Sequence, residues 1–96
     1  MDLGLKGKSA LVTGSSRGIG NRIAQAFANE GANICLCARN EEGLQSALQQ
    51  LDGQGVEVES VVADVTTVEG AETVVKAAVE RFGGLDILVN NVGGAI

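Results

Sequence analysis

Short apolar runs alternate with longer amphipathic segments along the whole of this 96-residue chain. The four apolar runs, at 9–13, 33–38, 56–63 and 86–90, are predicted to be strands. The segments between them have the periodicity of helices. Because the runs largely lack the strict alternation of a half-exposed sheet, they are typical of parallel strands covered on both faces.

This element order predicts an α/β fold with a doubly wound parallel sheet of the Rossmann type. Right-handed crossovers favour the strand order 3-2-1-4, which is the first half of a dinucleotide-binding fold plus one strand. No repeats or low-complexity tracts interrupt the pattern, so residues 1–96 are expected to form one small domain.

Capping signals mark the ends of the three predicted helices. Gly31 is expected to end the first helix, Asn40 to cap the second, and Thr66 with Glu69 to form a capping box for the third. The apolar faces are Ile19, Ile23, Ala26 and Phe27 in the first; Leu44, Ala47, Leu48 and Leu51 in the second; and Val68, Ala71, Val75, Ala78, Val79 and Phe82 in the third.

Composition and charge exclude several classes of function. A net charge of −5 argues against nucleic acid as the main partner, which needs a basic field. The absence of histidine excludes His-based triads and zinc sites. We find no signal peptide or membrane-length apolar run, so no membrane partner and a cytoplasmic location are expected. Cys35 and Cys37, about 6.6 Å apart if on one strand, are interpreted as small buried residues rather than a disulfide.

The segment TGSSRGIG, at 13–20, lies between the first predicted strand and the first predicted helix. A nucleotide pyrophosphate docks at this position, on the free N–H groups of the helix. Gly14 is suited to the tight turn, Gly18 to a close approach of backbone to phosphate, and Gly20 to close packing of helix on strand. The spacing is neither G-x-G-x-x-G nor a P-loop. A helix-entry loop that binds no ligand is the alternative.

Three stretches together resemble the short-chain dehydrogenase/reductase family: TGSSRGIG at 13–20, DV at 64–65 and NNVG at 90–93. Their order and separations fit the family, and the resemblance covers all 96 residues. The stretches GKSALVTGSSRGIG and DILVNN are also similar to the 3-oxoacyl-carrier-protein reductase and tropinone reductase branches. These stretches do not distinguish between the two branches.

The resemblance implies a role for each motif. Gly14, Gly18 and Gly20, with the backbone of Ile19, would line the cofactor pyrophosphate. Asp64 and Val65 would hold the adenine amino group, although a carboxylate at a strand end can instead cap the next turn. In the last motif Asn91 and Gly93 would be cofactor neighbours, Asn90 would tie the central strands together, and Val92 departs from the usual alanine.

The end of the second predicted strand favours NADP(H). An acid at that position would bond the ribose 2′-hydroxyl and select NAD, but here Ala38 takes its place and Arg39 follows. Arg17 in the glycine segment offers a second guanidinium for a 2′-phosphate. Ser15 and Ser16 add hydroxyl donors. The alternative is that both arginines are surface charges.

The chain has no tyrosine, whereas hydride transfer in the family uses a Tyr as general acid/base with a Lys one helical turn later. In the family these groups would follow residue 96. We therefore expect the cofactor-binding half of a reductase that interconverts a small carbonyl and an alcohol, inactive by itself and without catalytic or metal-binding residues. Two alternatives are a dinucleotide-binding module without chemistry and, less well supported, a methyltransferase-type fold.

The segment DILVNN, as a last strand, would be an exposed edge of the sheet. An exposed apolar edge predicts a homo-oligomer or an edge-paired dimer.

Overall fold

The computed structural model describes residues 4–14, 18–51 and 53–90. The elements are β1 (Ser9–Thr13), α1 (Gly18–Asn29), β2 (Asn33–Ala38), α2 (Glu41–Leu51), β3 (Val58–Val62), α3 (Val68–Phe82) and β4 (Ile87–Val89). All strand pairs are parallel and their order is β3-β2-β1-β4. The predicted fold class and strand order are confirmed.

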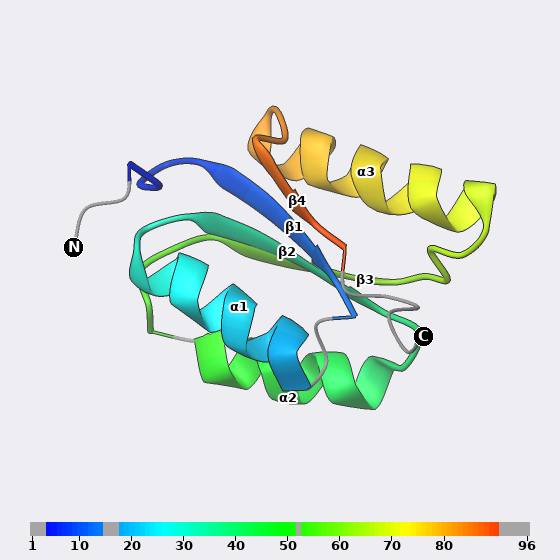
Figure 1. Cartoon of the computed structure of the whole chain (residues 1–96), viewed down its shortest axis with the longest axis horizontal. Helices are drawn as coiled ribbons and strands as arrows, with labels where there is room; N and C mark the ends of the chain where they lie inside the picture. The colour runs from blue at the N-terminus through cyan, green and yellow to red at the C-terminus, as the bar shows by residue number, and fades with distance from the viewer. Residues whose placement is uncertain (1–3, 15–17, 52, 91–96) are drawn as a thin grey trace.

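Helices cover both faces of the sheet: α1 and α2 lie on one side and α3 on the other (Figure 1). This is the arrangement that right-handed crossovers impose when the chain runs outward from β1 to β3 and then returns past β1 to β4. The register pairs Leu11 of β1 with Cys35 of β2 and with Leu88 of β4. The strands all point the same way, so their carboxyl ends meet at one edge of the sheet.

Two apolar cores result, one on each face. The larger core lies beneath α1 and α2 and contains Val12, Ile34 and Leu36, all fully buried. The smaller core joins Leu11 and the two cysteines to Val74 and Ala78 of α3. Cys35 and Cys37 are buried thiols that are not joined in a disulfide, as expected. Burial raises the pKa of the Cys35 thiol to about 12 and that of Cys37 to about 11.

In α1 the buried positions differ in part from the predicted face. Ala24 and Ala28 are buried, one and two turns after the buried Gly20, whereas Ala26 is exposed. Ile23 and Phe27 are half-buried and pack beside this line. The prediction weighted the large apolar residues, but the smallest side chains occupy the line where the helix approaches the sheet most closely.

The start and the buried face of α3 also differ from the prediction. The N-cap is Thr67, whose hydroxyl accepts a hydrogen bond from the Gly70 N–H at 3.0 Å, so the capping box at Thr66 was wrong. Thr66 is instead held by the carboxylate of Asp64. Val74 and Ala78 are the buried residues of α3. The predicted stripe was wrong for three valines that lie exposed on its flank: Val68, Val75 and Val79.

The second helix and the strands are close to the prediction. Asn40 caps α2 as expected, because its Oδ1 accepts a hydrogen bond from the Glu42 N–H at 2.8 Å. The predicted buried positions Leu44, Ala47 and Leu51 are confirmed. The strands β3 and β4 are shorter than predicted, because each ends where the ladder with its neighbour ends.

Candidate cofactor-binding edge

The candidate site is the edge of the sheet where the parallel strands end (Figure 1). Gly14 follows β1 directly and has φ 62°, a left-handed conformation that glycine adopts without the strain of a Cβ. The helix α1 begins at Gly18 and continues through Ile19 and Gly20. Five predicted site residues lie outside the described residues: Ser15, Ser16, Arg17, Asn91 and Gly93.

The start of α1 suits an anion. The first N–H groups of a helix lack partners within the helix and carry partial positive charge. The first turn of α1 contains no acidic residue that would compete for them. Gly20 is buried, which agrees with its expected role in close packing of α1 against the sheet. A strand, a glycine in a tight turn and a helix N-terminus therefore stand in the order that pyrophosphate binding requires.

Arg39 follows Ala38, the last residue of β2, at the same edge of the sheet as Gly14. Its side chain is exposed, whereas Ala38 before it is 8% exposed. The pairing of β2 with β3 continues past the strand ends, because the Ala63 N–H donates to the Ala38 carbonyl at 3.0 Å. This brings Arg39 near Asp64, and the guanidinium contributes to lowering the pKa of that carboxyl. A cation and a carboxylate thus lie at neighbouring strand ends.

The Asp64 carboxylate is held by the turn that follows it. Its Oδ1 accepts hydrogen bonds from the backbone N–H of Thr66 at 2.9 Å and from the Thr66 hydroxyl at 2.5 Å. These two bonds are the main reason why the pKa of Asp64 lies below its ordinary value. Both bonds use Oδ1, so the turn-capping interpretation of Asp64 holds for that oxygen. The group is ionised at neutral pH and is oriented before any ligand arrives.

A polar contact ties the two central strands together at the same edge. The Thr13 hydroxyl donates to Oδ1 of Asn90 at 3.0 Å, which joins the end of β1 to the residue after β4. This is the strand-tying role expected for Asn90. Sequence reasoning did not identify Thr13 as its partner. The only available signal was that both residues end predicted strands.

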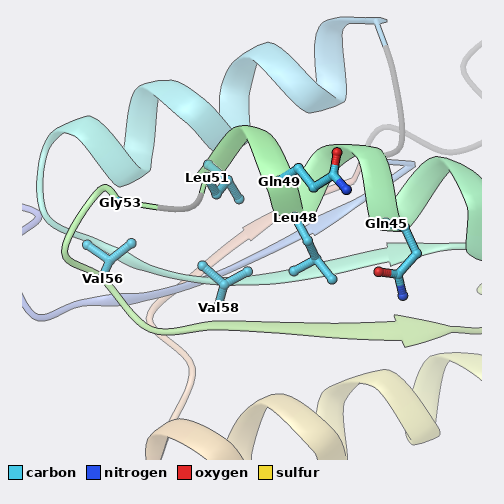
Figure 2. Close-up of a pocket in the computed structure, with 7 residues that line it drawn as sticks. All are labelled: Gln45, Leu48, Gln49, Leu51, Gly53, Val56 and Val58. Atoms are coloured by element: carbon cyan, nitrogen blue, oxygen red, sulfur yellow. The ribbon is translucent and has the colours of Figure 1, made fainter.

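Among the described residues, two hollows lie beside these strands. One, of about 130 Å³, is at the site itself and is lined by Leu11, Thr13, Val65, Ala71, Val74, Val75, Leu88 and Asn90. Another, of about 380 Å³, lies between α2 and β3 (Figure 2), where Leu48 faces Val58. Val56 and Val58 of the second hollow stand at the start of β3, at the opposite edge from the site. The first hollow, although smaller, is therefore the one that adjoins the candidate site, through Thr13, Val65 and Asn90.

Asp86 lies just before β4, at the opposite edge of the sheet from the candidate site. Its Oδ2 accepts from the Ser9 N–H at 2.9 Å and its own N–H donates to the Ser9 carbonyl at 2.9 Å, so it joins the starts of β1 and β4. Across residues 4–14, 18–51 and 53–90, no three His, Cys, Asp or Glu residues gather as metal ligands would. Within the same ranges no helix combines the length and apolar character needed to cross a bilayer.

Comparison with known proteins agrees with this geometry. The sequence model of the short chain dehydrogenase family matches residues 8–96. The 3-oxoacyl-[acyl-carrier-protein] reductase FabG of Vibrio cholerae is 45% identical over 91 residues, which cover 95% of this chain and 36% of that protein. The chain therefore spans about a third of the length of the curated relatives it matches.

Two solved structures that are similar to this chain hold different cofactors, NADPH in one and NAD+ in the other. L-sorbose reductase of Gluconobacter frateurii, complexed with NADPH and L-sorbose, is 51% identical and superposes with a TM-score of 0.92 over 97% of this chain and 36% of its own. An NAD+-bound xylitol dehydrogenase is 39% identical, with a TM-score of 0.83 over 88% of this chain and 32% of its own. With this fold, this strand order and this match, the chain belongs to the short-chain dehydrogenase family of oxidoreductases.

Proposed function

We propose that residues 1–96 form the NADP(H)-binding part of a short-chain oxidoreductase that interconverts a small carbonyl compound and an alcohol. One observation carries the proposal: the glycine turn with the start of α1, the Arg39 cation and the oriented Asp64 carboxylate lie at one edge of the sheet. Each of these groups matches a different part of a dinucleotide phosphate, so the residues present fit the cofactor.

The proposed contacts involve the pyrophosphate and the adenosine part of the cofactor. Gly14, Gly18 and Gly20 would hold the pyrophosphate, with the backbone of Ile19. Asp64 and Val65 would hold the adenine amino group, and Asn91 and Gly93 would lie beside the adenosine ribose. When bound, the reduced cofactor supplies the hydride. The residues of this chain bind and orient it, and the positively charged start of α1 offsets the charge of the pyrophosphate.

NADP(H) is proposed over NAD(H) because of the charge at the end of β2. Arg39 is exposed there and can pair with a 2′-phosphate, while the small buried Ala38 offers no carboxylate to repel one. Arg17, Ser15 and Ser16 would complete that pocket. The NADPH-bound sorbose reductase is also more similar to this chain than the NAD+-bound xylitol dehydrogenase, which supports the same choice.

The test is a calorimetric titration of the purified chain with NADPH and with NADH. We expect binding of both cofactors, with NADPH at least tenfold tighter. Equal affinities would contradict the assignment of the 2′-phosphate to Arg39, and no binding of either would overturn the proposal as a whole. S-adenosylmethionine serves as the control ligand and should not bind.

A second candidate is a dinucleotide-binding module without chemistry, which the absence of tyrosine from the 96 residues favours. Oxidation of NADPH with a panel of carbonyl compounds separates the two. Residues 1–96 alone should show none, whereas the longer polypeptide that carries them should. Failure of the longer polypeptide to oxidise NADPH with any carbonyl compound would favour the module.

We also propose that the chain associates through β4, which ends the sheet order and leaves Leu88 60% exposed. An apolar edge strand with free backbone groups favours pairing with a second copy. Light scattering of the 96-residue chain should give the mass of a dimer or a larger species. A monomer at high concentration would contradict this. We also propose that the protein is located in the cytoplasm.

A further inference from the structure

Gly70, in the first turn of α3, lies against the backbone of Asp64. A Cβ built at position 70 would stand 1.8 Å from the Asp64 carbonyl oxygen, 2.6 Å from its carbon and 2.9 Å from the Thr67 hydroxyl. Real Cβ atoms essentially never approach another heavy atom within 3.0 Å. The backbone at Gly70 does not have a positive φ. Glycine is therefore needed here for the close approach and not for its conformational freedom, although it is a poor residue inside a helix.

The close approach is part of a small network, which we call the Asp64 clamp and define as Thr66, Thr67 and Gly70. The Thr67 hydroxyl donates to the Asp64 carbonyl at 2.9 Å and accepts from the Gly70 N–H at 3.0 Å. The Thr67 N–H also donates to this carbonyl oxygen, at 3.2 Å, and the Thr66 N–H donates to the carboxylate. The start of α3 thus holds both the backbone and the side chain of Asp64.

We propose that Gly70 and Thr67 are positioning residues for recognition of the adenine base, which they would not touch. The inference rests on the proposed function, in which Asp64 and Val65 meet the adenine amino group. An alanine at position 70 must separate its Cβ from the Asp64 oxygen from 1.8 Å to at least 3.0 Å, so α3 and the segment 64–65 must move relative to each other. A displacement of this size takes a hydrogen bond out of its working range of distances.

The test compares two ligands on each variant of the full polypeptide that carries this sequence. One is NADP+, and the other is nicotinamide hypoxanthine dinucleotide phosphate, in which an oxygen replaces the adenine amino group. The second ligand cannot donate the proposed hydrogen bond from the amino group to the charged Asp64 carboxylate. Unmodified protein should therefore bind NADP+ about tenfold more tightly. In Gly70→Ala the preference should fall below about twofold.

The matched control is Gly84→Ala, because a Cβ at Gly84 would meet no atom within 4 Å and its φ is not positive. This variant should keep the full preference. A change that only destabilises the fold would alter both affinities alike, so the ratio of the two affinities isolates positioning. A Gly70→Ala variant that folds and keeps the tenfold preference overturns the inference.

A second pair of variants decides the matter if Gly70→Ala does not fold. Thr67→Ser keeps the hydroxyl that bonds both Asp64 and Gly70 and should keep the preference, whereas Thr67→Val should lose it. Equal preference in these two variants also overturns the inference. If unmodified protein binds both ligands equally well, the adenine role proposed for Asp64 fails. If it binds neither, the proposed function fails.

Discussion

Replacing Arg39 with aspartate tests the proposed preference for NADP(H) over NAD(H). Arg39 is exposed at the carboxyl end of β2, after the buried Ala38, at the position where an acid would select NAD. The substitution reverses the charge at a surface position and removes no buried contact. The fold should therefore survive, and any change in binding reports on the charge.

The size of the effect follows from Coulomb's law. A guanidinium and a phosphate about 4 Å apart attract by about 1 kcal/mol in bulk water, the appropriate medium for an exposed side chain. Reversing the charge removes that attraction and adds a repulsion of similar size. The loss for NADPH is about 2 kcal/mol, or roughly 30-fold in affinity. NADH has no 2′-phosphate, and the new carboxylate can accept a bond from its 2′-hydroxyl, so its affinity should hold or rise.

Fluorescence titration of the unmodified and variant proteins with NADPH and NADH measures both affinities. The control is Lys76→Asp, which makes the same change in net charge on the outer face of α3, where the side chain is 77% exposed. If Arg39→Asp weakens NADPH binding no more than this control does, Arg39 is a surface charge and the electrostatic reasoning fails. A loss shared equally by NADPH and NADH would also refute it.

Three further predictions concern the core and the titratable groups. Leu36→Ala, at a fully buried position of β2, should lower the free energy of unfolding by about 3 kcal/mol in urea denaturation, and a loss below about 1 kcal/mol would contradict the packing described. The raised pKa values of Cys35 and Cys37, about 12 and 11, lie above those of unfolded thiols. The free energy of unfolding should therefore be constant below about pH 8.5 and fall as pH rises toward 11. The cysteines of the folded chain should be alkylated slowly at pH 8. Rapid alkylation at that pH would argue against their burial. The pKa of Asp64 is lowered, so its ionised form stabilises the folded state above about pH 4, and this contribution is lost as pH falls through the folded-state pKa. Asp64→Asn should reduce the loss of thermal stability on acidification, and an unchanged acid profile would show that the Thr66 bonds contribute nothing.

The order of elements was readable from the sequence because it depends on local patterns. Apolar runs, helical periodicity and glycines between them are properties of neighbouring residues, and the handedness of crossovers then leaves few topologies. This is why the order β3-β2-β1-β4 and the Asn40 cap were predicted correctly. The same logic placed Gly14, Arg39 and Asp64 at one edge, since the carboxyl ends of parallel strands meet there.

Contacts between elements were decided by the tertiary structure. The helix α3 carries apolar residues on more than one side, and only its docking on the sheet selects Val74 and Ala78 for burial and leaves Val68 exposed. The requirement for glycine at position 70 arises only because the Asp64 carbonyl lies against it, six residues away in the chain. Thr13 and Asn90 are 77 positions apart, and their bond exists because β1 and β4 are neighbours in the sheet. Local sequence therefore determined which elements form and in what order, whereas distances between atoms far apart in the chain exist only once those elements have packed.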